Sequence, residues 1–189
     1  MTGVQTCALP IYEAKILHIN TAQFAQRVES LGARKTGSYH FRRYVFDTIP
    51  TQANKWVRLR TDGSHTTITC KEIVNNAIDG TIEKEVVVDD FDQALDVLVA
   101  LGLKPRGCQE NRREEYILDG VQITVDSWPL LDDYAEIEGD GSDQVMDMIM
   151  KLGYSPNDAA YKNTDELYKE IGVDLRTVAE LRFDDDVRK

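Results

Sequence analysis

The 189-residue chain contains only three cysteines and three histidines. Cys7, Cys70 and Cys108 show no Cys-x-x-Cys spacing, so the sequence indicates free thiols rather than a disulfide framework. The histidines are scattered and do not form the cluster that a zinc site needs. No hydrophobic run approaches the roughly 18 apolar residues of a membrane-spanning helix, and no signal peptide is recognisable. We therefore expect a cytoplasmic protein that does not enter a membrane.

Positive charge is also scarce, because 22 Lys and Arg stand against 33 Asp and Glu, for a formal net charge of −11. A chain this acidic is not expected to bind nucleic acid or an anionic membrane non-specifically, although it can contain a local basic pocket. The hydrophobic content of 42% is enough for one core, and the length fits a single domain.

The first eleven residues, MTGVQTCALPI, do not share the pattern that follows. They match the conceptual translation of a common short-read sequencing adapter, read from a GTG start. We therefore expect residues 1–11 to be an artefact, residues 12–189 to form one domain, and the native sequence to enter near Glu13. A natural N-terminus of unusual composition is the alternative.

The rest of the chain alternates between strand-like and helix-like segments. Two-residue periodicity predicts strands over 12–19, 39–48, 55–61, 66–72, 81–88, 111–118, 121–127 and 133–138. Helical spacing with start and stop signals predicts helices over 21–31, 90–101, 142–152, 164–171 and 174–182, with Asp90 and Ser142 as N-terminal caps. Turn signals at Asp62-Gly63 and Asp119-Gly120 join neighbouring strands, so the order predicts an antiparallel α+β fold.

Several predicted strands carry two charges of the same sign at positions i and i+2. The pairs are Arg58 with Arg60, Glu83 with Glu85, and Glu136 with Glu138. Side chains at these positions point to the same face of a strand, roughly 6–7 Å apart. Like charges at that distance repel unless an opposite charge lies between them. The carboxylate pairs therefore indicate a divalent cation, and the arginine pair indicates a polyanion.

Each of these strands has one polar face and one apolar face. In 55–61, for example, Trp56, Arg58 and Arg60 alternate with Val57 and Leu59. A half-solvated sheet with helices on its apolar side explains this pattern. A closed barrel of about eight strands, with the charged faces inside, is the other interpretation. Blocks of charge of one sign favour the barrel, because solvated faces usually mix signs.

A set of short motifs follows in order along the chain: Glu13-x-Lys15, Arg43-Tyr44 with Phe46-Asp47-Thr48, Val57-Arg58-Leu59-Arg60, Lys71, Glu83-x-Glu85, Arg112-Arg113, Asp126 with Trp128-Pro129, and Tyr134-x-Glu136-Ile137-Glu138-Gly139. No single motif is specific, but the ordered set resembles the CYTH domain. This is the family of triphosphate tunnel metalloenzymes, which includes class IV adenylyl cyclases and thiamine triphosphatase. The resemblance spans about residues 12–155. It implies a closed antiparallel eight-stranded β-barrel with a charged tunnel and flanking helices.

The resemblance also implies a role for each matched residue. Carboxylates would bind Mg²⁺ or Mn²⁺, and these are Glu13, Asp126, Glu136 and Glu138. Cationic side chains would bind the phosphoryl oxygens of the substrate, and these are Lys15, Arg43, Arg58, Arg60, Lys71 and Arg113. Lys15, Glu83 and Glu85 would take part in catalysis. The structural alternatives are a solvated strand edge for the acids and surface salt bridges between strands for the cations.

The family's opening motif is Glu-x-Glu-x-Lys, and this chain has Ile11 where the first Glu is expected. We attribute the difference to the artefact. The expected function is a metal-dependent phosphohydrolase acting on inorganic tripolyphosphate or on a nucleoside or other organic triphosphate, as a monomer or homodimer. The alternatives are a class IV-type adenylyl cyclase that makes cyclic AMP from ATP, and a non-catalytic module that binds polyphosphate or nucleotide. No residue set for recognising adenine is visible, so hydrolysis is preferred.

Overall fold

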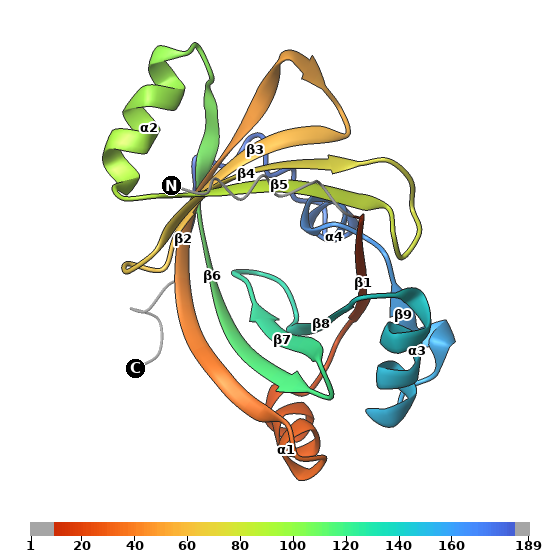
Figure 1. The fold of residues 1–189 in the computed structure, drawn as a ribbon. Coiled ribbons are helices and arrows are strands. Elements are labelled where there is room, and N and C mark those ends of the chain that lie inside the picture. Colours follow the sequence, from red (N-terminus) through yellow and green to blue (C-terminus); the bar gives the residue numbers. More distant parts are fainter. Residues whose placement is uncertain (1–9, 184–189) are drawn as a thin grey trace, which may run out of the picture.

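Figure 1 shows the computed structural model, which describes residues 10–183. The strands are β1 (Pro10–Ile16), β2 (Arg34–Gln52), β3 (Lys55–Thr61), β4 (Thr66–Ile73), β5 (Thr81–Val88), β6 (Pro105–Leu118), β7 (Val121–Ser127), β8 (Tyr134–Gly139), β9 (Ala159–Ala160) and β10 (Glu180–Leu181). The helices are α1 (Thr21–Ser30), α2 (Phe91–Ala100), α3 (Ser142–Lys151) and α4 (Thr164–Glu170), with a 3-10 turn at Pro156–Asp158. The predicted artefact, which includes Cys7, lies mostly outside the described residues.

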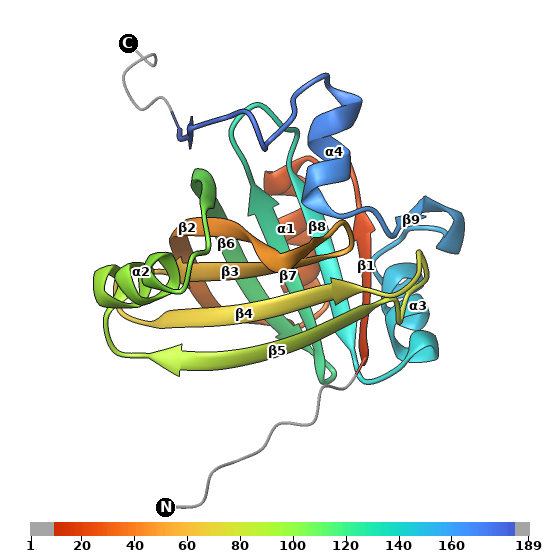
Figure 2. The same ribbon diagram turned by 90° about the horizontal axis from the view of Figure 1, so that it is seen from above.

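Eight strands close into a barrel in which every neighbouring pair is antiparallel. The order around the barrel is β6-β2-β3-β4-β5-β1-β8-β7, and β7 pairs with β6 to complete the circle. Figure 2 shows the same strands from above. The predicted α+β fold, a closed eight-stranded antiparallel barrel with flanking helices, is therefore confirmed. The half-solvated open sheet is not formed.

The pairing of β1 with β5 is the shortest between neighbouring strands of the barrel. Its residues Tyr12 to Ile16 pair with β8, whereas Pro10 and Ile11 pair with Ile82 and Thr81 of β5. Beyond that short contact with β5, Lys15 and Ile16 pair with β9 instead. The junction between β1 and β5 therefore depends on the residues that directly precede the motif of Glu13 and Lys15.

Two strands are much longer than the alternating pattern predicts. β2 and β6 pair from Arg34 with Ile117 to Phe46 with Pro105, whereas the pattern predicted only 39–48 and 111–118. The extra residues show no regular alternation of polar and apolar side chains. They form strands because each backbone segment supplies the hydrogen-bonding partners of the other, which a local pattern does not reveal.

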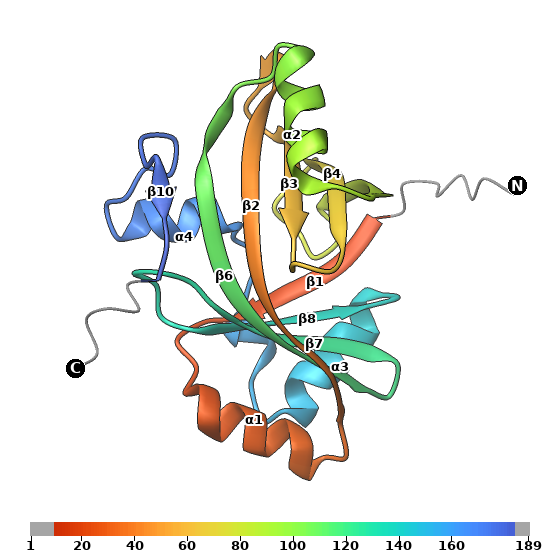
Figure 3. The same cartoon turned by 90° about the vertical axis from the view of Figure 1, so that its left-hand side faces the viewer.

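The helices cover the apolar outer faces of the strands, so that the charged faces turn inward. Phe46 of β2 and Leu59 of β3 are fully buried beneath α2. On the opposite side, Ile123 of β7 and Ile137 of β8 pack in a core with α1 and α3. Figure 3 shows α2 at one end of the molecule and α1 and α3 at the other. Within the described residues, no helix is long and apolar enough to cross a membrane.

Two local predictions are wrong. Residues 174–182 do not form a helix: they contain a turn and β10, which pairs in parallel with Cys108 and Gln109 of β6. Leu175 and Leu181 are held in the core beside α4, and this packing overrides the helical spacing. Ser142 is the first residue of α3 rather than its cap. The N-cap position is Gly141, which makes no side-chain capping bond. Cys70 and Cys108 are free thiols, as predicted.

Candidate functional site

The barrel encloses a cavity of about 270 Å³, which we call the central cavity. All eight barrel strands contribute to its lining, because every second residue of each strand faces the interior of the barrel. Of the predicted site residues, every one except Asp126 lines it: Glu13, Lys15, Arg43, Arg58, Arg60, Lys71, Glu83, Glu85, Arg113, Glu136 and Glu138. The residues that the motifs single out across more than 120 positions of sequence therefore meet in one enclosed space.

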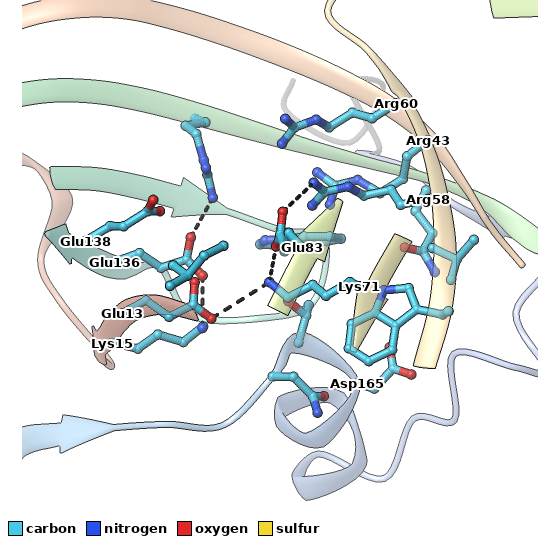
Figure 4. A pocket seen from close by; sticks show the side chains of 18 of the residues that line it. Glu13, Lys15, Arg43, Arg58, Arg60, Lys71, Glu83, Glu136, Glu138 and Asp165 are labelled. Carbon is cyan, nitrogen blue, oxygen red and sulfur yellow. Dashed lines mark hydrogen bonds and ion pairs between the residues drawn. The ribbon is translucent and has the colours of Figure 1, made fainter. Parts of the chain in front are cut away.

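The charges in the central cavity are partly separated, as Figure 4 shows: the labelled glutamates other than Glu83 lie on one side together with Lys15, and the labelled arginines lie on the other. Glu13 of β1 and the pair of Glu136 and Glu138 on β8 form an acidic wall. Arg43 of β2 and the pair of Arg58 and Arg60 on β3 form a basic wall. The two partners that the same-sign pairs predicted stay predictions: a cation suits the acidic wall, and a polyanion suits the basic wall.

The arginines of the basic wall repel one another. Burial and the neighbouring charges of Arg58 and Arg60 hold the pKa of Arg43 well below its usual range. Burial and the charges of Arg58 and Arg113 lower the pKa of Arg60 to about 10. Their carboxylate neighbours therefore do not neutralise these guanidinium groups fully. A bound anion would relieve this repulsion.

Three buried N–H groups at the central cavity have no hydrogen-bond partner among the described residues. They are Nε of Arg43, Nε of Arg58 and the indole Nε1 of Trp128. All three are donors, and a buried donor without an acceptor costs free energy. The guanidinium of Arg43 also lies over the Trp128 ring, 4.5 Å from its centroid, which fixes both groups at the cavity wall. These three donors therefore lack acceptors, which the oxygens of a bound phosphate can supply.

Lys71 of β4 and Glu83 of β5 join the two walls. The ammonium of Lys71 lies 2.7 Å from the carboxylate of Glu83 and 3.8 Å from that of Glu13. Burial opposes ionisation of Glu83, but Lys71 and Arg58 outweigh it and the pKa of Glu83 is lowered. Glu85 accepts a hydrogen bond of 2.6 Å from the Thr69 hydroxyl and lies 3.6 Å from Arg58. Both members of this acidic pair are therefore held beside the basic wall.

A chain of ion pairs runs behind the acidic wall. Lys15 lies 2.9 Å from Glu136, and Arg113 donates to the same carboxylate at 2.6 Å. Burial disfavours the charged forms, but the mutual attraction is larger: the pKa of Lys15 is raised and that of Glu136 is lowered. Glu136 is thus ionised and already paired with two cations, so it is a weaker candidate for metal binding than its neighbour Glu138.

Asp126 is separated from the cavity. It is fully buried, and its oxygens accept hydrogen bonds from Arg113 (2.9 and 2.7 Å), Asn111 (2.9 Å) and Thr124 (3.1 Å). In this arrangement the carboxylate orients Arg113 toward the cavity. That Asp126 binds a metal ion stays a prediction.

Among the carboxylates that line the central cavity, Glu138 has no ion-pair partner within the described residues. Burial and the charges of Glu13 and Glu136 raise its pKa to about 7, and its backbone pairs directly with that of Glu13. Within residues 10–183 no group of three or more His, Cys, Asp or Glu is arranged to hold a metal ion alone. Mg²⁺ does not need such a group, since it commonly takes one or two carboxylates and completes its shell with water and substrate phosphates. Glu13 and Glu138 fit that kind of site.

Sequence reasoning missed part of the lining. Gln109 and Tyr134 are buried residues of β6 and β8 that line the central cavity, and three residues at the start of α4, Asn163, Thr164 and Asp165, also line it. The only signal for Gln109 is its even spacing from Arg113 on β6. No sequence pattern near α4 predicted that this helix borders the cavity. Arg106 helps to hold it there through ion pairs to Asp47 and, at 3.3 Å, to Asp165.

The structure is thus a closed barrel with an ionic interior that has an acidic and a basic wall. A family model, that of the CYTH domain, matches residues 10–159. The chain therefore belongs to the CYTH domain family, and the resemblance seen in the sequence is confirmed. A search of curated proteins found no match.

Solved structures with the same fold come from several organisms. The PH1012 protein of Pyrococcus horikoshii OT3 is 25% identical, with a TM-score of 0.73, covering 83% of this chain and 98% of that one. A putative adenylate cyclase of Vibrio parahaemolyticus is 15% identical, with a TM-score of 0.73, covering 86% and 99%. A putative adenylyl cyclase of Hippeastrum, described as having a dominant triphosphatase activity, is 13% identical, with a TM-score of 0.61, covering 86% and 96%. At the lower two identities the likeness concerns the fold alone.

Proposed function

We propose that this protein is a metal-dependent phosphohydrolase that cleaves tripolyphosphate or an organic triphosphate inside its barrel. Family membership supports a triphosphate-related activity in general, and enzymes of this family are generally metal-dependent. The observation that carries the proposal is the basic wall, where mutually repelling arginines present buried N–H donors that have no acceptor among the described residues.

The residues of the chain would bind and orient the substrate. Arg43, Arg58 and Arg60 offer forked donors that suit phosphoryl oxygens, and Lys71 offers a point charge. The charge of the phosphate chain would in turn remove the repulsion within the basic wall. Enclosure by the barrel strengthens these contacts because it limits the screening by water.

The acidic wall would hold the metal. Glu13 and Glu138 are the candidate ligands, and a divalent cation bound there would neutralise charge that develops on the phosphate oxygens. Glu83 and Glu85 are candidates for positioning the attacking water, since both lie on the inner face of β5 next to Arg58. Lys15 would keep Glu136 charged and in place.

Product analysis tests the proposal and separates the alternatives. The protein is incubated with tripolyphosphate or ATP and with Mg²⁺ or Mn²⁺, and the products are resolved by chromatography. Release of orthophosphate is expected. Cyclic AMP with pyrophosphate would instead identify a class IV-type adenylyl cyclase. Tight binding without turnover would identify a binding module, and either result would overturn hydrolysis.

Ile11→Glu should raise turnover. Ile11 lines the central cavity two residues before Glu13, on the same face of β1. A carboxylate there would therefore join the acidic wall. We expect at least a tenfold gain in kcat at low Mg²⁺ and a lower Mg²⁺ concentration for half-maximal rate. Ile11→Gln is the matched control, because it adds a polar side chain of similar size without the charge. Equal rates for the Glu and Gln variants would contradict the predicted metal role of this position.

A further inference from the structure

A second cavity, of about 540 Å³, adjoins the central cavity. The two share Arg60, Arg113 and Gln122, and the second extends from there to the turn between β3 and β4. No residue of α4 lines it, so it lies away from the part of the central cavity that α4 borders. Its volume is typical of small-molecule sites. One ligand that contacts the shared residues can therefore extend into both cavities.

The second cavity differs from the first in charge. Apart from the two shared arginines, no lysine or arginine of the described residues lines it. Its carboxylates are already hydrogen-bonded: Asp62 accepts from two backbone N–H groups of the β3–β4 turn at 2.7 Å each, and Glu115 accepts from the Thr36 hydroxyl at 2.7 Å. Its histidines, His40 and His65, are exposed and lie beside carboxylates. A phosphate chain would gain little beyond the shared arginines, so this cavity suits an uncharged part of a ligand.

Aromatic rings form one side of the second cavity. The rings of Tyr39 and Phe41 stack with their centroids 5.4 Å apart, and the guanidinium of Arg60 lies 4.5 Å from the Phe41 centroid. Tyr39 can lie over the chain there only because residue 37 is glycine, since a Cβ at Gly37 would come within 2.3 Å of the Tyr39 hydroxyl oxygen. The stack thus leads from the basic wall into the second cavity, and its half-buried outer ring, Tyr39, is the one that a flat ring can contact.

The second cavity also contains a buried hydroxyl on β4. Thr67 of β4 lines the second cavity, and its buried Oγ1 has no hydrogen-bond partner among the described residues. A turn about χ1 brings a buried threonine hydroxyl to the cavity surface, where it can donate to or accept from a sugar hydroxyl or a base nitrogen. The second cavity thus combines aromatic rings and an unpartnered hydroxyl with polar groups near the shared arginines. This combination suits a nucleoside better than an inorganic phosphate.

We propose that the second cavity binds the nucleoside part of a nucleoside triphosphate whose phosphate chain lies in the central cavity. This inference rests on the proposed function for the phosphate chain, and it adds that the substrate is a nucleotide rather than inorganic tripolyphosphate alone. Trp56, which lines the central cavity, is the competing place for a base.

The test compares ATP with tripolyphosphate on the full chain. Thr67→Val removes the hydroxyl and keeps the shape, and Tyr39→Leu removes the ring. For each variant kcat/KM is measured with both substrates, and the dissociation constants are measured by calorimetry. We expect both variants to lose about tenfold or more in kcat/KM and in affinity for ATP, the size of loss typical of a lost base contact, and to stay within about twofold for tripolyphosphate.

Tripolyphosphate is the internal control, because it has no group to place in the second cavity. Thr51→Val, at an exposed position of β2 outside both cavities, controls for the substitution itself. Equal losses for both substrates would show a merely structural effect and overturn the inference. So would unchanged ATP affinity, or a loss selective for ATP in Trp56→Leu but not in the two variants. If neither substrate is hydrolysed, the proposed function fails, and the calorimetric comparison still decides the inference.

Discussion

Arg58→Ala should weaken tripolyphosphate binding by about 100-fold or more. Arg58 lies on the basic wall, its Nε is buried without a partner among the described residues, and its guanidinium is 3.6–3.7 Å from Glu83 and Glu85. A hydrogen bond to a charged group contributes about 1.5–3 kcal/mol, and a guanidinium fork can make two with a phosphate. The loss of both bonds accounts for the expected effect, which calorimetric titration measures.

The same change should leave the stability of the free protein within about 1 kcal/mol of the wild type. Removing Arg58 breaks its ion pairs, but it also removes a charge that lowers the pKa of both Arg43 and Arg60. These two effects oppose one another, and urea unfolding reports their sum. Arg34→Ala, at an exposed position on β2, is the matched control and should keep the wild-type affinity. An Arg58→Ala protein that is stable and binds tripolyphosphate normally would remove Arg58 from the site.

Local alternation predicted most strands and the turns between them, because one face of each strand is apolar and the other is charged. At the turn between β6 and β7 the two residues Asp119 and Gly120 both have positive φ, as the Asp-Gly signal requires. Closure of the barrel did not follow from alternation, since an open sheet with a wet face has the same pattern. It followed from the blocks of like charge on successive strands and from the family resemblance.

The remaining parts of the site depend on tertiary packing. Asp126 alternates correctly with the inner face of β7, yet its neighbours Asn111 and Thr124 enclose it behind Arg113. Alternation gives the face of a strand but not the depth at which a side chain is covered. In the same way Asp165 reaches the central cavity through tertiary contacts of α4, which include its ion pair with Arg106, 59 positions away in sequence.

Glu138→Gln should stabilise the metal-free protein at pH 8 and impair its function. The pKa of Glu138 is about 7 in the folded protein, because burial and the charges of Glu13 and Glu136 disfavour its ionised form. In the unfolded chain the pKa is near 4.5. The folded state therefore holds this proton more tightly, and the wild type loses stability as the pH rises from about 4.5 to 7. Glutamine stays neutral and avoids that loss.

We expect the Glu138→Gln protein to exceed the wild type by on the order of 2 kcal/mol in its free energy of unfolding at pH 8 in EDTA, and to match it at pH 4. Urea unfolding at several pH values measures the difference. Glu170→Gln, which removes a half-exposed carboxylate paired with Lys162, is the control and should change little. A difference that does not depend on pH would contradict the assigned cause.

Glu138→Gln should impair Mg²⁺ binding and catalysis, although it raises the stability of the metal-free protein. The mutual repulsion that destabilises the acidic wall in EDTA is what a divalent cation would relieve, so the neutral variant gains stability and loses affinity for Mg²⁺. We expect a drop of at least 100-fold in kcat at limiting Mg²⁺, and less thermal stabilisation by added Mg²⁺ than in the wild type. Wild-type Mg²⁺ dependence in this variant would show that the metal does not bind at Glu138 and would leave Glu13 and Glu83 as the next candidates.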